Sequence, residues 1–294
     1  MRAALAVLAA VTLLTGCGSS GPKSLDDLWH GPGEQVGIVA GTSDYGLGDV
    51  RVSFLVVDRQ GKPVYVPRAT VWLAPTLKSA PVLQTTAALE AVGPPGTAGD
   101  GADVTHLYVV HLRIAKPGTW WVLARPDGAR IGAVGNLVVR QRSASPAVGS
   151  NAYPSRTPTL ASARGAVATL TTRVPPDRSL LRYSVADSLR AHAPFVLLFA
   201  TPKFCTSRTC GPVTDVVLAV QRREASSGIR FIHVEIYKDN VVAHGENRWV
   251  KEWRLPSEPW IFLVGRDGRI RAKFEGSVSA GELDAAVRAE LLQH

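Results

Sequence analysis

Two cysteines stand close together in the segment FATPKFCTSRTCGPV, which covers residues 199–213. Four residues separate Cys205 from Cys210, and Gly211 and Pro212 follow the second cysteine directly. Two thiols at such a spacing can exchange with a disulfide through a mixed-disulfide intermediate. They can also form a structural disulfide if their Cα atoms approach within about 7 Å, or bind a soft metal ion such as Cu(I). The pair is therefore the candidate site, with three chemistries open.

The residues after Cys210 predict a helix that begins beside this thiol. Proline is well tolerated in the first turn of a helix, and four valines then fall on one helical face: Val213, Val216, Val217 and Val220. A thiolate at a helix N-terminus is stabilised by the helix dipole and by backbone N–H groups, and Arg208 adds a nearby positive charge. We therefore expect Cys210 to be the nucleophile and Cys205 to resolve. The reverse order is the alternative.

The segments around the two cysteines alternate between strand and helix patterns. Continuous apolar runs are typical of buried strands, a Ser-x-x-Glu or Ser-x-x-Asp pattern is typical of a helix start, and a tight RDG turn predicts a hairpin. The predicted elements, in chain order, are a helix start at 184–187, strands at 195–200 and 229–237, a short helix near 248–255, a hairpin of 258–264 with 269–276, and a helix capped by Ser279 and Glu282. These elements predict an α/β domain.

This order of elements resembles the thioredoxin superfamily over residues 179–294. The chain is most similar to membrane-tethered thioredoxin-like lipoproteins of high-GC bacteria that carry an immunoglobulin-like domain in front. The resemblance implies a thioredoxin-like fold, and it implies that Pro259, before WIFLV, is the family's cis-proline facing the dithiol. The chain departs from the family's Cys-Gly-Pro-Cys, because Val213 follows Pro212 and the second thiol lies upstream.

Two glutamates are auxiliary candidates. The family keeps a buried acid on the strand before the nucleophile, but FVLLFA contains none. Glu235, within FIHVEIY, is the only carboxylate on a predicted core strand and is a conceivable substitute. Glu258 precedes Pro259, where the family usually has a small or β-branched residue. A carboxylate there would raise the pKa of the thiols or bind a basic partner; alternatively, it is a surface glutamate paired with an arginine.

Two further functions remain open for the cysteine pair. In the first, Cys205 and Cys210 form a structural disulfide in a binding lipoprotein that performs no reaction. In the second, the chain resembles the copper-handling Sco family, with Cys205, Cys210 and His244 as ligands. The Sco spacing is three residues, however, and four intervene here. The leading expectation is a thiol–disulfide oxidoreductase, for which we expect no metal and no cofactor.

The N-terminus predicts export and a lipid anchor. Residues 1–17 contain a positive start, an apolar run from Ala3 to Leu14, and the sequence Leu-Thr-Gly-Cys, which resembles a bacterial lipoprotein box. Such a box implies acylation of Cys17 after cleavage. No later apolar run reaches the roughly 20 residues of a membrane span. We therefore expect a protein anchored by lipid to the extracytoplasmic face of the cell membrane.

The remainder of the chain predicts a second domain and its connections. Residues 18–35 indicate a flexible spacer. Residues 36–140 contain about seven short strand patterns separated by turns, which is typical of an immunoglobulin-like β-sandwich. Residues 141–178 are rich in Ser, Pro and Thr and indicate a linker, or a strap over the next domain. The 294 residues suit two domains.

The net charge and the expected compartment limit which classes of partner the protein can have. The net charge is +9, but basic residues are spread through both halves and are interleaved with Asp and Glu. Nucleic acid is therefore not an expected partner. The expected partners are the thiols or disulfides of client proteins outside the cytoplasm and the membrane, which the N-terminal lipid would contact. A membrane thiol-electron donor is implied by the family resemblance.

Overall fold

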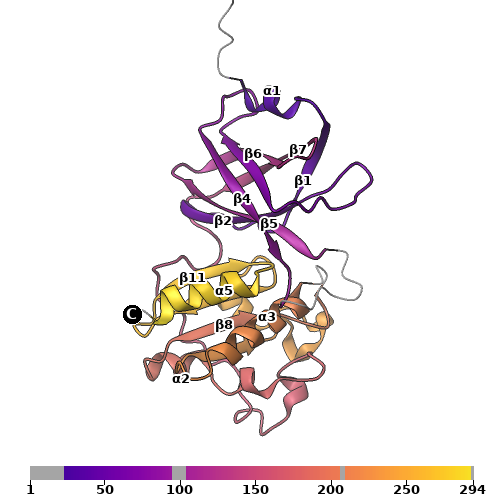
Figure 1. Cartoon of the computed structure of the whole chain (residues 1–294). Helices are drawn as coiled ribbons and strands as arrows, with labels where there is room; N and C mark the ends of the chain where they lie inside the picture. Colours follow the sequence, from indigo (N-terminus) through magenta and orange to yellow (C-terminus); the bar gives the residue numbers. More distant parts are fainter. Residues whose placement is uncertain (1–22, 95–103, 206–208, 293–294) are drawn as a thin grey trace, which may run out of the picture.

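The structure is a computed structural model that describes residues 23–94, 104–205 and 209–292. The expected signal peptide, its lipidated Cys17 and the auxiliary candidate Arg208 lie outside these ranges. Two sheet-containing domains are stacked along the long axis of the molecule, with the N-terminal domain above the C-terminal one in Figure 1. Within the described ranges, none of the helices has the length and apolar character that crossing a membrane requires.

The N-terminal domain is a closed sheet of seven strands in the order β1-β2-β5-β4-β3-β6-β7 (Figure 1). Every neighbouring pair is antiparallel except β1 and β7, whose parallel pairing closes the sheet. The strands are β1 (Glu34–Ala40), β2 (Gly48–Val56), β3 (Arg68–Ala74), β4 (Leu83–Ala91), β5 (His106–Ile114), β6 (Gly118–Pro126) and β7 (Ile131–Val139). A short helix, α1 (Leu25–Trp29), and the start of β1 lie within the range predicted as spacer.

Alternation of apolar residues explains why these segments form strands. In β2, Val50, Val52, Phe54 and Val56 are all buried in the core of the N-terminal domain. Successive side chains of a strand point to opposite faces, so every second residue faces the interior. A smaller cluster around Leu25 packs α1 against the outside of the sheet.

The C-terminal domain is built on a four-stranded sheet in the order β11-β10-β8-β9. Strand β8 (Phe195–Phe199) pairs in parallel with β9 (Arg230–Val234) and antiparallel with β10 (Trp260–Val264), which forms a hairpin with β11 (Ile270–Glu275). The helices are α2 (Val185–Arg190), α3 (Cys210–Arg223), α4 (Arg248–Glu252) and α5 (Ala280–Val287). Shorter helical turns are at Val167–Thr169, Arg178–Leu181, Lys238–Asn240, Val242–His244 and Arg288–Leu292.

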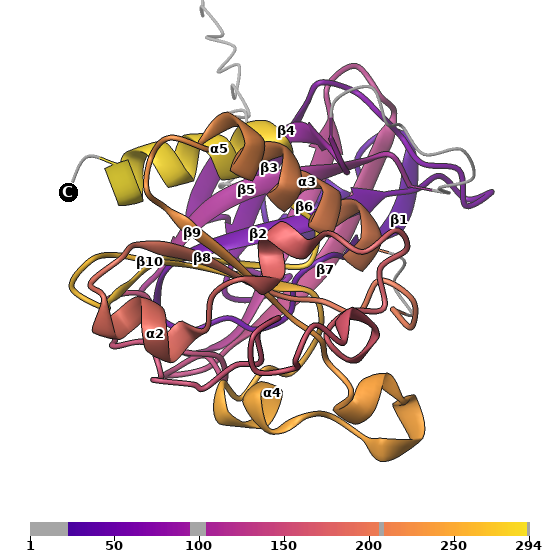
Figure 2. The ribbon, with the colours of Figure 1, turned by 90° about the horizontal axis from the view of Figure 1, so that it is seen from below.

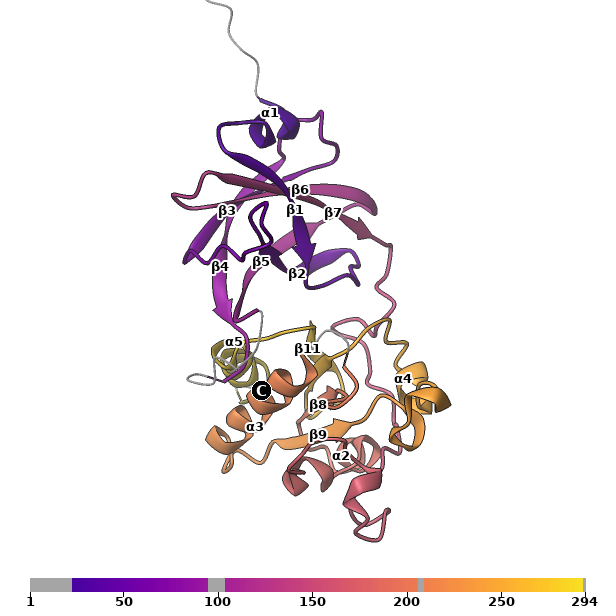
Figure 3. The same ribbon diagram turned by 90° about the vertical axis from the view of Figure 1, so that its right-hand side faces the viewer.

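Helices cover both faces of this sheet. Val196 and Leu198 lie on the face of the sheet that packs against α3 and α5. Leu197 and Phe199 lie on the opposite face and pack against residues of α2 and α4. Figures 2 and 3 show these two pairs of helices on opposite sides of the strands. Because both faces are buried, the strands have the continuous apolar character noted in the sequence.

The segment 141–178 lies along the C-terminal domain for much of its length. The Trp253 indole donates to Ser155 Oγ at 2.9 Å, and the Val185 backbone N–H donates to Thr157 Oγ1 at 3.0 Å. Ala152 is buried in the same core as Trp253. These contacts are those of a strap that packs on the domain.

Polar contacts join the two domains. The Arg51 guanidinium on β2 donates twice to the Glu282 carboxylate on α5, at 2.6 and 2.9 Å, and once to the Ser277 carbonyl at 2.9 Å. We expected Ser279 and Glu282 to form a capping box. Ser279 Oγ accepts a hydrogen bond from the Glu282 backbone N–H as expected, but the Glu282 carboxylate pairs with Arg51 instead. Gly276 has φ +69°, and a Cβ there would lie 2.6 Å from the Gly41 carbonyl oxygen of the other domain. Glycine therefore permits this close approach.

Candidate functional site

The two cysteines meet at the N-terminus of α3. The helix begins at Cys210, as the sequence predicted, because Val213, Val216 and their neighbours pack into the core. The chain from the end of β8 brings Cys205 next to this end, where the Cys210 backbone N–H donates to Cys205 Sγ at 3.3 Å. Cys205 is half-buried, whereas Cys210 is fully buried. Both are thiols in the structure.

The surroundings of Cys210 oppose its ionisation. A hydrogen bond with Cys205, burial, and the negative charges that Cys205 and Glu258 can carry raise the pKa of the Cys210 thiol well above its usual range, while the Thr201 backbone acts in the other direction. The helix N-terminus instead directs a backbone N–H to Cys205 Sγ, and such a contact favours negative charge on sulfur. The backbone contact at the helix N-terminus that we expected to stabilise Cys210 is therefore made to Cys205 Sγ.

Glu258 lies against both sulfurs. The Glu258–Pro259 peptide bond is cis, as the resemblance implied. One carboxylate oxygen and the two Sγ atoms all lie within 4.8 Å of one another. Oε2 is buried with no hydrogen-bond partner among the described residues. Burial first, then the negative charges of Cys205, Glu235 and Glu246, raise the pKa of Glu258 to about 7. This carboxyl group can therefore hold or release a proton near neutral pH.

Two residues beyond the end of β9 complete the surroundings. Glu235 follows the strand, is buried, and accepts hydrogen bonds from the Thr172 backbone N–H and hydroxyl. Tyr237 packs edge-on against Phe204, and burial together with nearby negative groups raises its pKa. We had not singled out Tyr237. Because β8 and β9 are parallel, residues beyond their carboxyl ends meet at one edge of the sheet. This rule could have identified Tyr237 from the sequence.

One group among the described residues has the ligand spacing of a metal site: Cys205, Cys210 and Glu258. His244, the ligand expected from the Sco resemblance, does not belong to it, and its ring nitrogen lies 3.1 Å from Asp239 Oδ2 instead. A carboxylate with two thiolates suits Zn²⁺ better than Cu(I), which prefers soft ligands. The structure therefore does not bring together the copper ligands proposed from the sequence.

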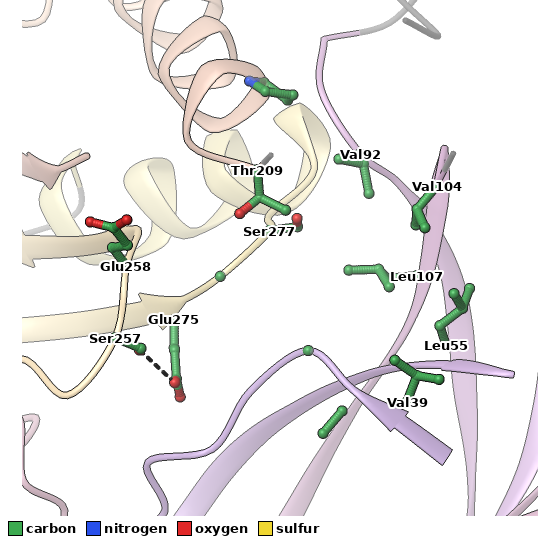
Figure 4. Close-up of a pocket in the computed structure, with 14 residues that line it drawn as sticks. Val39, Leu55, Val92, Val104, Leu107, Thr209, Ser257, Glu258, Glu275 and Ser277 are labelled. Atoms are coloured by element: carbon green, nitrogen blue, oxygen red, sulfur yellow. Dashed lines mark hydrogen bonds between the residues drawn. The ribbon is translucent and has the colours of Figure 1, made fainter. Parts of the chain in front are cut away.

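A pocket of about 320 Å³ opens between the two domains (Figure 4). One of its lining residues, Glu258, has a carboxylate oxygen within 4.8 Å of both sulfurs. On the C-terminal side it is lined by Thr209 and Pro212 from the start of α3, by Ser257 and Glu258 before Pro259, and by Ser277. On the N-terminal side the lining side chains are aliphatic. The pocket, called the interdomain pocket below, therefore adjoins the reactive groups.

The C-terminal half has the elements of a thioredoxin-like domain. They are, in chain order, a strand, a cysteine-bearing loop, a helix starting at Cys210, a parallel strand, and a cis-proline before a hairpin. No family model and no curated protein matches the chain. Twelve chains of solved structures match, among them a thiol:disulfide interchange protein of the thioredoxin family from Chlorobium tepidum TLS. It is 14% identical with a TM-score of 0.27, and the match covers 48% of this chain and 99% of that one. A likeness this weak carries no conclusion about activity.

Proposed function

We propose that this protein is a thiol–disulfide oxidoreductase that uses Cys205 as the nucleophile and Cys210 as the resolving cysteine. One observation carries the proposal: Cys205 Sγ accepts the first backbone N–H of α3 and is partly exposed, while the Cys210 thiol is buried behind it. Nucleophilic cysteines need both access and stabilisation of the thiolate. A cysteine pair that only forms a structural disulfide would need neither access to solvent nor a stabilised thiolate.

The exchange proceeds in two balanced steps. The Cys205 thiolate attacks one sulfur of a client disulfide, so that a mixed disulfide forms and the other client sulfur leaves as a thiolate, which takes a proton from solvent. Cys210 then loses its proton and attacks Cys205 Sγ, which releases the second client thiolate. The client is reduced and a Cys205–Cys210 disulfide remains. An external dithiol must then reduce the Cys205–Cys210 disulfide. The membrane thiol-electron donor that the family resemblance implies would supply this dithiol. The reverse sequence oxidises a client.

Glu258 is the base in the second step. The Cys210 thiol is fully buried, so it needs a nearby acceptor for its proton before it can attack. The Glu258 carboxylate lies within reach of both sulfurs, and its pKa of about 7 lets it accept that proton and return it to solvent.

The setting of the enzyme is part of the proposal. Leu14, Thr15, Gly16 and Cys17 support a lipid anchor at the extracytoplasmic face of the membrane, with clients in that compartment. For the N-terminal domain we propose an immunoglobulin-like sandwich. The strand order supports this proposal, because β1-β2-β5-β4 would match the A-B-E-D sheet of that fold and β3-β6-β7 its C-F-G sheet. In the structure the two sets of strands are joined into one closed sheet by the pairing of β3 with β4 and of β1 with β7.

Single serine variants test the order of attack. Cys210→Ser, mixed with a disulfide substrate, should accumulate a mixed disulfide through Cys205 that mass spectrometry detects, whereas Cys205→Ser should form none. Accumulation on Cys205→Ser alone would reverse the order. The reduction potential tests the activity: a catalytic pair should lie between about −120 and −270 mV, whereas a value below about −300 mV with slow exchange would indicate a structural disulfide.

A further inference from the structure

The interdomain pocket has two chemically different walls. Its N-terminal wall is formed by aliphatic side chains from β1, β2 and β5, from the residue after β4 and from the segment before β5: Val39, Leu55, Leu107, Val92 and Val104. Figure 4 shows them grouped on one side of the pocket. Val39 is 49% exposed. Apolar surface in a concave site favours an apolar group in the occupant.

The opposite wall is polar and has unsatisfied groups. Ser277 Oγ and Glu258 Oε2 are both buried and have no hydrogen-bond partner among the described residues. Ser257, Glu258 and Glu275 line this wall, and hydroxyl and carboxylate groups in a concave site can form hydrogen bonds with an occupant. Glu258 is also the carboxylate beside the sulfurs. The occupant must therefore combine an apolar group, polar groups and, at the end nearest the dithiol, sulfur.

We propose that the interdomain pocket binds an extended polypeptide segment of the client that carries an aliphatic side chain next to its reactive cysteine. This inference rests on the proposed function. The side chain contacts the aliphatic wall of the N-terminal domain, and the main chain of the segment meets the polar wall. The pocket volume of about 320 Å³ is at the lower end of ligand pockets, so it accepts a short segment and not a folded surface. The N-terminal domain thereby determines which disulfides react.

Short peptides test this specificity on the full chain. Each carries one cysteine joined by a disulfide to 5-thio-2-nitrobenzoate, flanked either by leucine or by serine. Release of the coloured thiol on mixing with excess pre-reduced protein, which is oxidised to the Cys205–Cys210 disulfide, gives the second-order rate constant of reduction. We expect wild type to prefer the leucine peptide by about tenfold or more. Val39→Ser should lower this preference severalfold, and Val92→Ser should act in the same direction. Val82→Ser is the matched control, because Val82 is 63% exposed and does not line the pocket.

Two further measurements separate the failure of the inference from that of the enzyme. The free dithiobis-nitrobenzoate is small and does not need the aliphatic wall, so its reduction reports on the dithiol, and Val82→Ser should reduce it at the wild-type rate. If wild type reduces it but shows no preference between the peptides, the inference is wrong and the proposed function stands. Preference for a disulfide carrying a fatty-acyl chain over the leucine peptide would also overturn the inference, in favour of a lipid.

Binding without reaction gives an independent readout. A fluorescent leucine peptide with alanine in place of cysteine should bind wild type more tightly than Val39→Ser, as measured by anisotropy. If this binding is found but no disulfide reacts, the pocket assignment holds and the oxidoreductase proposal fails. Equal affinity for the leucine and serine peptides would contradict the pocket assignment.

Discussion

The two domains contribute to the site in opposite ways. The C-terminal domain supplies the reactive groups: two thiols and a carboxyl within 4.8 Å of one another. Among the described residues, those of the N-terminal domain that line the interdomain pocket are all apolar or glycine. One domain is therefore suited to chemistry and the other to recognition. This division depends on the interface that holds them together, and three predictions test it.

The largest expected effect is at the Arg51–Glu282 ion pair. The two side chains are only 8% and 15% exposed, so Arg51→Ala would leave the Glu282 charge buried and unpaired. We expect the free energy of unfolding, measured by urea denaturation, to fall by about 3–5 kcal/mol. Arg113→Ala is the matched control, because the Arg113–Asp49 pair is 80% and 73% exposed; its effect should stay within about 0.5 kcal/mol. Equal effects would mean that this pair does not hold the domains together.

Glu258→Gln should have a smaller effect that depends on pH. The pKa of Glu258 rises from 4.5 in the unfolded chain to about 7 in the folded protein. The folded state therefore binds more protons than the unfolded state between these values, and the wild type loses stability as pH rises through this window. The variant should match wild type near pH 4 and exceed it by about 1–2 kcal/mol at pH 8, after screening at this half-buried site is allowed for.

Urea denaturation at several pH values measures this difference. Val82→Ser serves as the control, because it changes no ionisable group and its difference from wild type should not vary with pH. A constant difference between Glu258→Gln and wild type would show that the carboxyl group is not held neutral in the folded protein.

The smallest expected effect compares two helix caps. Ser279 Oγ caps α5 and also donates to Glu90 of the other domain at 2.8 Å, whereas Ser24 caps α1 at the far end of the molecule. Ser279→Ala should lower the free energy of unfolding by about 1 kcal/mol, and Ser24→Ala by about 0.5 kcal/mol. A larger loss for Ser24→Ala in thermal or urea unfolding would mean that the contact with Glu90 adds no stability.

Much of the C-terminal domain could be predicted because its signals are local. The run from Phe195 is a strand, the helix beside the second cysteine begins at Cys210, and Ser184 and Ser279 cap their helices. The closed order of the seven strands was not predictable in the same way, since pairing of β1 with β7 joins residues about a hundred positions apart. The pairing of Glu282 with Arg51 was missed for the same reason.

The sequence by itself determined which residues could react and which elements carry them, because helix and strand periodicity, caps and the Gly-Pro after Cys210 act over a few residues. Only the tertiary structure decided which thiol is accessible, that Glu258 lies beside both sulfurs, and that an aliphatic wall from the other domain adjoins them. Burial, proton affinity and pocket shape are set by groups that packing brings together from distant parts of the chain.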